Sequence, residues 1–187
     1  MESDLASLVH AASNGDRGAW EAIVNRYGRL VWAVARSFRL SAADAADVSQ
    51  TTWLRLVEHL DGLRDPAGLG SWLATTARRE ALAVLRKQRE VPTPDTDPLD
   101  DRQPPPWQGL LVDERDSELR RAFRRLPARC QTLLRLLVLE PAPSYAAAAA
   151  ALDIPIGSLG PTRARCLATL RRHISVYTAD EGGTHAN

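Results

Sequence analysis

A proline-rich, acidic stretch at residues 91–112 divides the chain into two parts and so limits what it can fold into. The stretch reads VPTPDTDPLDDRQPPPWQGLLV, and six of the 12 prolines of the chain lie between Pro92 and Pro106. Such a segment buries too little apolar area to offset the entropy lost when its backbone is ordered. We therefore expect a flexible linker, which would reach about 70 Å when extended and could place two domains at separate sites.

Apolar residues recur at steps of three and four on both sides of this linker, which is the pattern of helices that bury one face. Helices are expected over about 17–38, 41–60 and 72–89 before it, and over about 113–126, 127–139, 145–152 and 158–174 after it. The sequence thus predicts an all-α fold with two helical domains. Their expected bounds are 1–90 and 113–176, with the linker over 91–112 and a disordered tail over 177–187.

The last two of these helices are expected to form a helix-turn-helix. Ser144 can cap the short helix 145–152, because a side-chain oxygen can accept a hydrogen bond from a first-turn amide. Residues 153–157 then form a tight turn, and Ser158 can cap the final helix. Two helices joined by so short a turn are typical of proteins that place the second helix in the major groove of DNA.

The net charge of +1 conceals a segmented distribution of charge. Residues 71–90 carry five basic and two acidic side chains and residues 119–187 carry ten and four, whereas residues 91–118 carry two and eight. Every basic side chain except Lys87 is an arginine, whose planar guanidinium suits phosphate oxygens and guanine edges. Two basic regions of this kind point to nucleic acid as a partner.

Sequence signals of membrane insertion and of catalysis are missing. No apolar run approaches the roughly 20 residues that cross a bilayer, and the N-terminus has no basic region before an apolar core, so we expect a cytoplasmic protein. Without an HExxH-type spacing or a Gly-rich phosphate loop, we expect no catalytic residue, metal site or cofactor. Cys130 and Cys166 lie far apart at apolar helical positions, and we expect buried thiols rather than a disulfide.

Both halves resemble the extracytoplasmic-function sigma factors, group IV of the bacterial primary-sigma-like family. Residues 126–172, with the stretch from Ser144-Tyr145 to Gly157-Ser158-Leu159, resemble region 4 of that family. The segments GDRGAWEAIVNRYGRLVWAVAR (15–36), DAADVSQTTWLRLVEHL (44–60) and SWLATTARREALAVLRKQR (71–89) resemble region 2. The resemblance implies a non-enzymatic factor that binds RNA polymerase core and promoter DNA and directs promoter-specific transcription initiation. An anti-sigma factor is a further partner that the family suggests.

The resemblance also implies which residues contact the polymerase and the DNA. The exposed face of helix 44–60 would meet the coiled coil of the largest polymerase subunit through Asp47, Gln50, Thr51, Trp53 and Val57, while region 4 would lie at the flap. The loop 61–70 would capture an unstacked base of the minus-ten element, beside the basic residues Arg78, Arg79, Arg86, Lys87 and Arg89. The minus-thirty-five element would meet Ser158, Thr162, Arg163, Arg165, Arg171 and Arg172.

The sequence departs from the family pattern in three places, and simpler interpretations stay open. Thr51 replaces an acidic residue, Gly160 and Pro161 replace a basic and a small polar one, and the alanines of 146–151 replace a helix with a polar or acidic residue. Asp47 and Gln50 could be solvated, the arginines could form a solvated basic face, and Trp53 and Trp72 could be core residues. The alternative function is a helix-turn-helix regulator that binds DNA without core polymerase and would need only residues 113–175.

Overall fold

The computed structural model describes residues 2–63, 65–90 and 114–181, and every regular element in these ranges is a helix. The N-terminal half consists of α1 (Glu2–Ser13), α2 (Arg17–Ser37), α3 (Ala42–His59), the 3-10 turns η1 (Leu60–Gly62) and η2 (Pro66–Gly68), and α4 (Leu69–Glu90). The C-terminal half consists of α5 (Glu114–Arg124), α6 (Ala128–Leu137), α7 (Tyr145–Leu152), the 3-10 turn η3 (Ile156–Ser158) and α8 (Leu159–Glu181). The all-α prediction is confirmed. The linker 91–112 falls outside the described residues.

Three of the helices begin where a short polar side chain accepts a hydrogen bond from a first-turn amide. Asp16 Oδ1 accepts from the Ala19 amide at 2.9 Å, and Ser41 Oγ from the Asp44 amide at 3.0 Å. Ser144 Oγ accepts from the Ala147 amide at 3.1 Å, as the sequence predicts. Each such cap contributes about 1 kcal/mol to helix stability.

The N-terminal half packs around the apolar faces of α2, α3 and α4. Its fully buried side chains include Ile23, Val31, Leu56 and Leu73. Tyr27 is half-buried beside this core, and burial raises the pKa of its phenol above the usual value, an effect that the neighbouring Arg26 guanidinium opposes. The four helices therefore form one bundle around this core.

A disulfide joins two helices of the C-terminal half. It joins Cys130 of α6 to Cys166 of α8, with a Cα–Cα distance of 5.3 Å. The expectation of two buried thiols was therefore wrong, because the fold brings together two positions 36 residues apart whose proximity no local spacing shows. The bond lies beside a small core of Leu133, Ala148 and Leu159.

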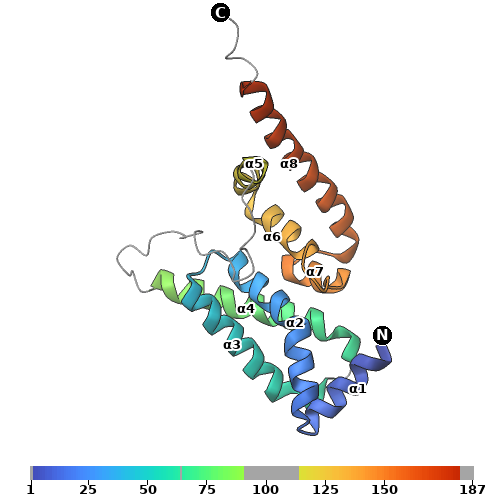
Figure 1. The fold of residues 1–187 in the computed structure, drawn as a ribbon. Helices are drawn as coiled ribbons and strands as arrows, with labels where there is room; N and C mark the ends of the chain where they lie inside the picture. The colour runs from blue at the N-terminus through green and yellow to red at the C-terminus, as the bar shows by residue number, and fades with distance from the viewer. Residues whose placement is uncertain (1, 64, 91–113, 182–187) are drawn as a thin grey trace, which may run out of the picture.

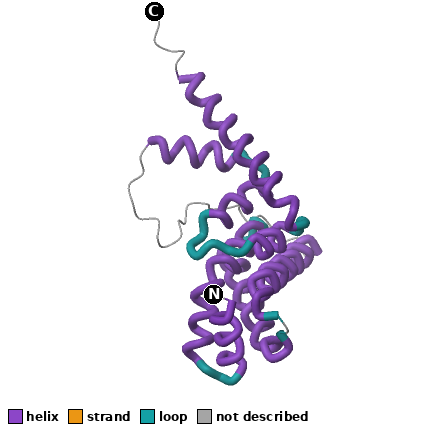
Figure 2. Tube along the Cα trace, turned by 90° about the vertical axis from the view of Figure 1, so that its right-hand side faces the viewer, coloured by secondary structure: helices purple, strands orange, loops and turns teal. Residues whose placement is uncertain are grey.

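The two halves are in contact rather than apart. Figure 1 shows α7 lying between the α1–α4 bundle and the remaining helices of the C-terminal half, and α4 and α7 are in extensive contact. The view turned by 90° shows the same stacking, with the C-terminal end of α8 directed away from the bundle (Figure 2). Leu136, Ala147 and Ala151 join the buried core of the N-terminal half. The halves therefore share a core.

We predict that the disulfide stabilises the C-terminal half. Closing a loop of this length removes about 3 to 4 kcal/mol of chain entropy from the unfolded state. Replacing both cysteines (Cys130→Ala/Cys166→Ala) should lower the free energy of unfolding by an amount of this order, as measured by denaturant titration under oxidising conditions. Adding a reductant to the unmodified chain should produce a similar loss and leave the double variant unchanged. If the reductant did not change the free energy of unfolding of the unmodified chain, this role of the disulfide would be contradicted.

Candidate polymerase and nucleic-acid interfaces

One face of α3 is exposed and combines acidic, amide and apolar side chains. Asp47 and Gln50 are exposed on it, and Val57 is 59% exposed. Thr51 is half-buried at its edge. Because these positions follow one another at steps of three and four, they line a single stripe along the helix. We call the side chains of Asp47, Gln50, Thr51, Leu54 and Val57 the α3 face.

Leu54 belongs to the α3 face, although the sequence reasoning did not name it. It is 56% exposed, whereas Leu56 two residues later is buried. The available signal was that Leu54 falls outside the spacing of Val48, Thr52, Leu56 and Leu60, which line the buried side. A large apolar side chain in that position, close to Val57, gives this polar stripe an apolar centre.

Trp53 lies mainly on the core side of α3. Its ring meets the ring of Trp20 edge-to-face, with centroids 6.3 Å apart, and it packs against the core of the N-terminal half. Trp72 likewise packs against this core, with the centroid of the His59 ring 6.0 Å from that of its own ring. Both tryptophans are therefore accounted for by packing.

A matched pair of leucines tests this division of α3. Leu54→Ala should change the free energy of unfolding by no more than about 0.5 kcal/mol, because the side chain is already largely in water. Leu56→Ala removes a buried side chain and should cost about 3 kcal/mol. Chemical denaturation of the two variants measures both values. If both variants lost the same free energy of unfolding, Leu54 would be buried in solution, and the exposure of the α3 face would be contradicted.

The basic side chains of α4 differ in their surroundings. Arg79, Arg86, Lys87 and Arg89 are exposed, and Arg79 and Arg86 share one side of the helix because they lie seven residues apart. Arg78 is different, since its Nη2 atom donates to Asp153 Oδ2 at 2.7 Å and its side chain is only 27% exposed. The structure thus brings four of the five predicted residues together at the surface and ties the fifth to the C-terminal half.

The loop before α4 is built from two short 3-10 turns. In η2, Asp65 Oδ1 accepts a hydrogen bond from the Ala67 amide at 3.0 Å. The loop leads directly into Leu69 and Gly70, both buried at the start of α4. Residue 64 lies outside the described residues. The segment predicted to hold an unstacked base is therefore adjacent to the N-terminal end of the basic helix.

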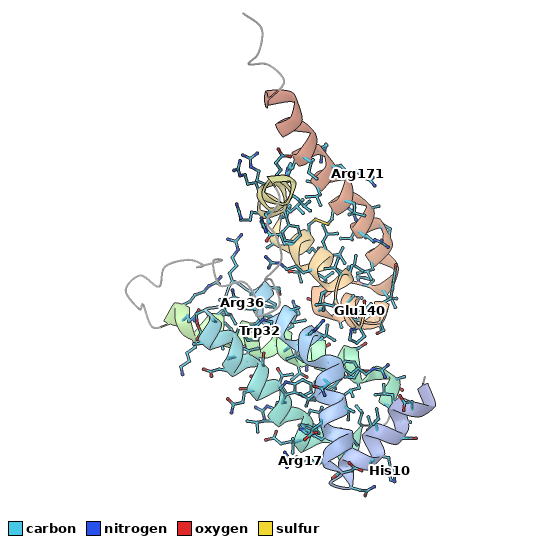
Figure 3. The ribbon with its side chains drawn as sticks, in the orientation of Figure 1. His10, Arg17, Trp32, Arg36, Glu140 and Arg171 are labelled. Atoms are coloured by element: carbon cyan, nitrogen blue, oxygen red, sulfur yellow. A yellow bond between two sulfur atoms is a disulfide. The ribbon has the colours of Figure 1, made fainter. Side chains whose placement is uncertain are left out.

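On α8, the predicted contact residues are spread around the helix. Arg165 and Arg172 lie two turns apart on one exposed side, and Arg163 and Arg171 are exposed on other sides. Arg171 lies on a part of α8 far from the α1–α4 bundle (Figure 3). Thr162 and Ser158 are half-buried, and α8 begins at Leu159 after η3. Arg165 and Arg172 are thus the pair best arranged to meet one groove.

Among the described residues, no group of three or more His, Cys, Asp or Glu side chains is arranged to hold a metal ion. In the same residues, none of the helices has the length and apolar character required of a membrane span.

Comparison with known proteins agrees with this geometry. Residues 23–91 match the family model of sigma-70 region 2. The fold resembles CnrH, solved in complex with the cytosolic domain of CnrY, at a TM-score of 0.59 and 20% identity over 90% of this chain and 96% of that one. It also resembles the sigma factor RpoE of Bartonella quintana, solved with the anti-sigma factor NepR, at a TM-score of 0.60 and 23% identity over 84% and 97% of the two chains. None of the curated proteins matched.

Residues 23–91 of the N-terminal half thus match sigma-70 region 2, and the chain as a whole shares the fold of these two structures.

Proposed function

We propose that this chain binds RNA polymerase core through the α3 face and directs promoter-specific initiation with two separate DNA-binding surfaces. The observation that carries the proposal is the α3 face itself. An exposed apolar pair, Leu54 and Val57, flanked by Asp47 and Gln50, is the composition of a protein-binding surface rather than of a DNA-binding one. Because α3 packs against α4, which carries the basic side chains, polymerase and nucleic acid could be bound by neighbouring helices.

The two basic surfaces have different tasks in this proposal. The exposed arginines of α4, with Lys87, neutralise phosphates of the separated minus-ten strands, and the loop 61–70 holds an unstacked base. The final helix lies in the major groove of the minus-thirty-five element, where Arg165 is nearer the base edges than Arg172. Region 2 spans 1–90 and region 4 spans 113–176 in this assignment.

Partners and setting follow from the same assignment. The polymerase contacts are the coiled coil of the largest subunit and the flap, and the chemistry of RNA synthesis belongs to the polymerase. The chain itself acts without catalytic residues or a cofactor, in the cytoplasm. Since the two similar structures were solved with CnrY and with the anti-sigma factor NepR, an anti-sigma factor is a third partner to test.

Reconstituted transcription tests the function. The purified chain should co-purify with core polymerase and direct run-off transcription from a promoter that core alone ignores. The alternative, a helix-turn-helix regulator without polymerase contacts, predicts duplex binding but neither co-purification nor transcript. Mapping the transcript start sites would then identify the promoter elements.

Substituting Leu54 should separate polymerase binding from folding. Leu54→Arg places a charge in the apolar centre of the α3 face and should weaken binding to core polymerase at least tenfold, because a buried unpaired charge costs several kcal/mol at an interface. Thermal unfolding should stay close to that of the unmodified chain. Arg17→Ala, at an exposed site on α2, serves as the control. Unchanged binding of the Leu54→Arg variant to core would remove the α3 face from the proposal.

Substituting arginines of α8 should change the salt dependence of duplex binding. Removing one phosphate-binding side chain lowers the slope of log affinity against log salt by about 1, whereas removing a base-reading side chain reduces sequence discrimination. We expect Arg172→Ala to weaken all duplexes alike and Arg165→Ala to weaken the preferred promoter more than a scrambled one. Fluorescence anisotropy of the holoenzyme across a salt series measures both. Identical behaviour of the two variants would contradict the assignment.

A further inference from the structure

The only two cysteines of the chain are bonded to each other in its C-terminal half. Cys130 lies in the first turn of α6, and Cys166 lies about two turns after the start of α8. Figure 3 shows the disulfide as the yellow bond between these helices. Disulfides are rare in a reducing cytoplasm, and those that form there are usually transient and catalytic or redox-sensing. In the cytoplasmic setting of the proposed function, this bond therefore calls for a role beyond permanent cross-linking.

The two sulfur atoms differ in their access to solvent. Cys130 is half-buried, whereas Cys166 is only 1% exposed. A dissolved oxidant or reductant therefore reaches the sulfur of Cys130 first. An accessible thiol beside a buried second thiol is the arrangement of a redox-sensing pair, in which the first thiol reacts and the second resolves the product. The Cα–Cα distance of 5.3 Å is already that of a disulfide, so the second step requires no displacement of either helix.

The bond also determines how firmly α8 is held. Over residues 159–174, the part of α8 whose side chains the structure describes, only Leu159 and Cys166 are buried. Leu159 is the first residue of the helix, so Cys166 is the one buried anchor beyond the first turn in that range. The small core around these two side chains has Leu133 and Ala148 as its other buried members. The attachment of α8 to α6 thus depends strongly on the covalent bond.

Cys166 lies in the same stretch of α8 as two of the arginines predicted to contact the minus-thirty-five element. Arg165 directly precedes it, and Arg163 lies about one turn earlier. Both arginines are exposed, whereas Cys166 is on the inner side of the helix. Side chains that contact base edges must be placed to within about 0.5 Å. A change in the anchoring of Cys166 therefore changes the placement of the side of α8 that would meet DNA.

We propose that Cys130 and Cys166 form a redox site that takes hydrogen peroxide as its oxidant and controls duplex binding by α8. The inference rests on the proposed function of α8. It has a chemical part, the formation and reduction of the bond, and a functional part, the effect of the bond on binding.

The oxidation proceeds in two steps. The thiolate of Cys130 attacks the peroxide, so that an S–O bond forms and the O–O bond breaks. The sulfur is oxidised to a sulfenic acid, and the hydroxide that leaves takes up the proton lost by the Cys130 thiol, which gives water. The thiol of Cys166 then attacks this sulfur, so that the S–S bond forms and a second water leaves. A dithiol reductant reverses the bond by thiol–disulfide exchange, gives its two protons to the cysteines and becomes a disulfide itself.

Alkylation of the reduced chain tests the chemical part without any substitution. Iodoacetamide should label Cys130 about tenfold faster than Cys166, because thiol reactivity follows exposure. In the presence of dimedone, peroxide should trap a sulfenic acid in the Cys166→Ala variant, whereas the reduced unmodified chain should form the disulfide instead. Mass spectrometry of the peptides measures all three. Equal labelling of the two cysteines, or no disulfide in the peroxide-treated unmodified chain, would overturn the redox site.

Run-off transcription with core polymerase tests the functional part. Apparent affinity falls in proportion to the fraction of chains that are competent to bind. We therefore expect the reduced chain to give about tenfold less transcript than the oxidised chain, and peroxide to restore it. Binding to core polymerase should be equal in both states, because the α3 face belongs to the other half. The Cys130→Ala/Cys166→Ala variant should transcribe at the reduced level under either reagent, which controls for effects on the polymerase.

The outcomes separate this inference from the proposed function. Equal transcription by the oxidised and reduced chains, or a double variant that also responds to peroxide, would overturn the control of α8. If the unmodified chain did not transcribe in either state, the proposed function would be overturned. The labelling of the chain alone would still decide whether the two cysteines form a redox site.

Discussion

The packing of α7 between two cores is the constraint on which the arrangement of this protein depends. Each alanine of the run 146–151 contributes one methyl group, so the helix can approach α4 on one side and α6 and α8 on the other. A longer side chain at Ala147 would have to displace backbone or core, and overpacking of this kind costs about 1 to 3 kcal/mol. The same run raises helix propensity, which matters in a helix as short as Tyr145–Leu152.

Much of the fold could be predicted from sequence because most helices bury one continuous stripe. The periodicity in 17–38, 41–60 and 72–89 predicted α2, α3 and α4 to within a few residues, and the cap at Ser144 follows from side-chain chemistry. Ser158, also predicted as a cap, lies instead in the 3-10 turn η3 before α8. The first helix, α1, was not predicted, although Leu5 and Val9 are buried one turn apart. Its signal is short and set among small residues. At the other end, α8 extends to Glu181, beyond the expected start of the tail at residue 177.

Some features of the candidate site could be predicted from single helices, whereas others depend on contacts between residues far apart in the sequence. The exposure of Asp47, Gln50 and the α4 arginines follows from the position of each residue on its own helix. The pairing of Arg78 with Asp153, 75 residues apart, and of Cys130 with Cys166 depends on how helices meet, which local spacing does not contain. Leu54 is an intermediate case. Its position around the helix axis could be predicted from the sequence, but its apolar side chain suggested a core residue.

The α3 face is exposed although the two halves of the chain are packed together. In the proposed function, polymerase would contact the α3 face without any prior change in the arrangement of the two halves. A genome offers millions of nonspecific sites to any protein with free arginines. Because most arginines of α4 and α8 are exposed in the free chain as well, early binding to polymerase through the α3 face would shorten the time that the chain spends on such sites.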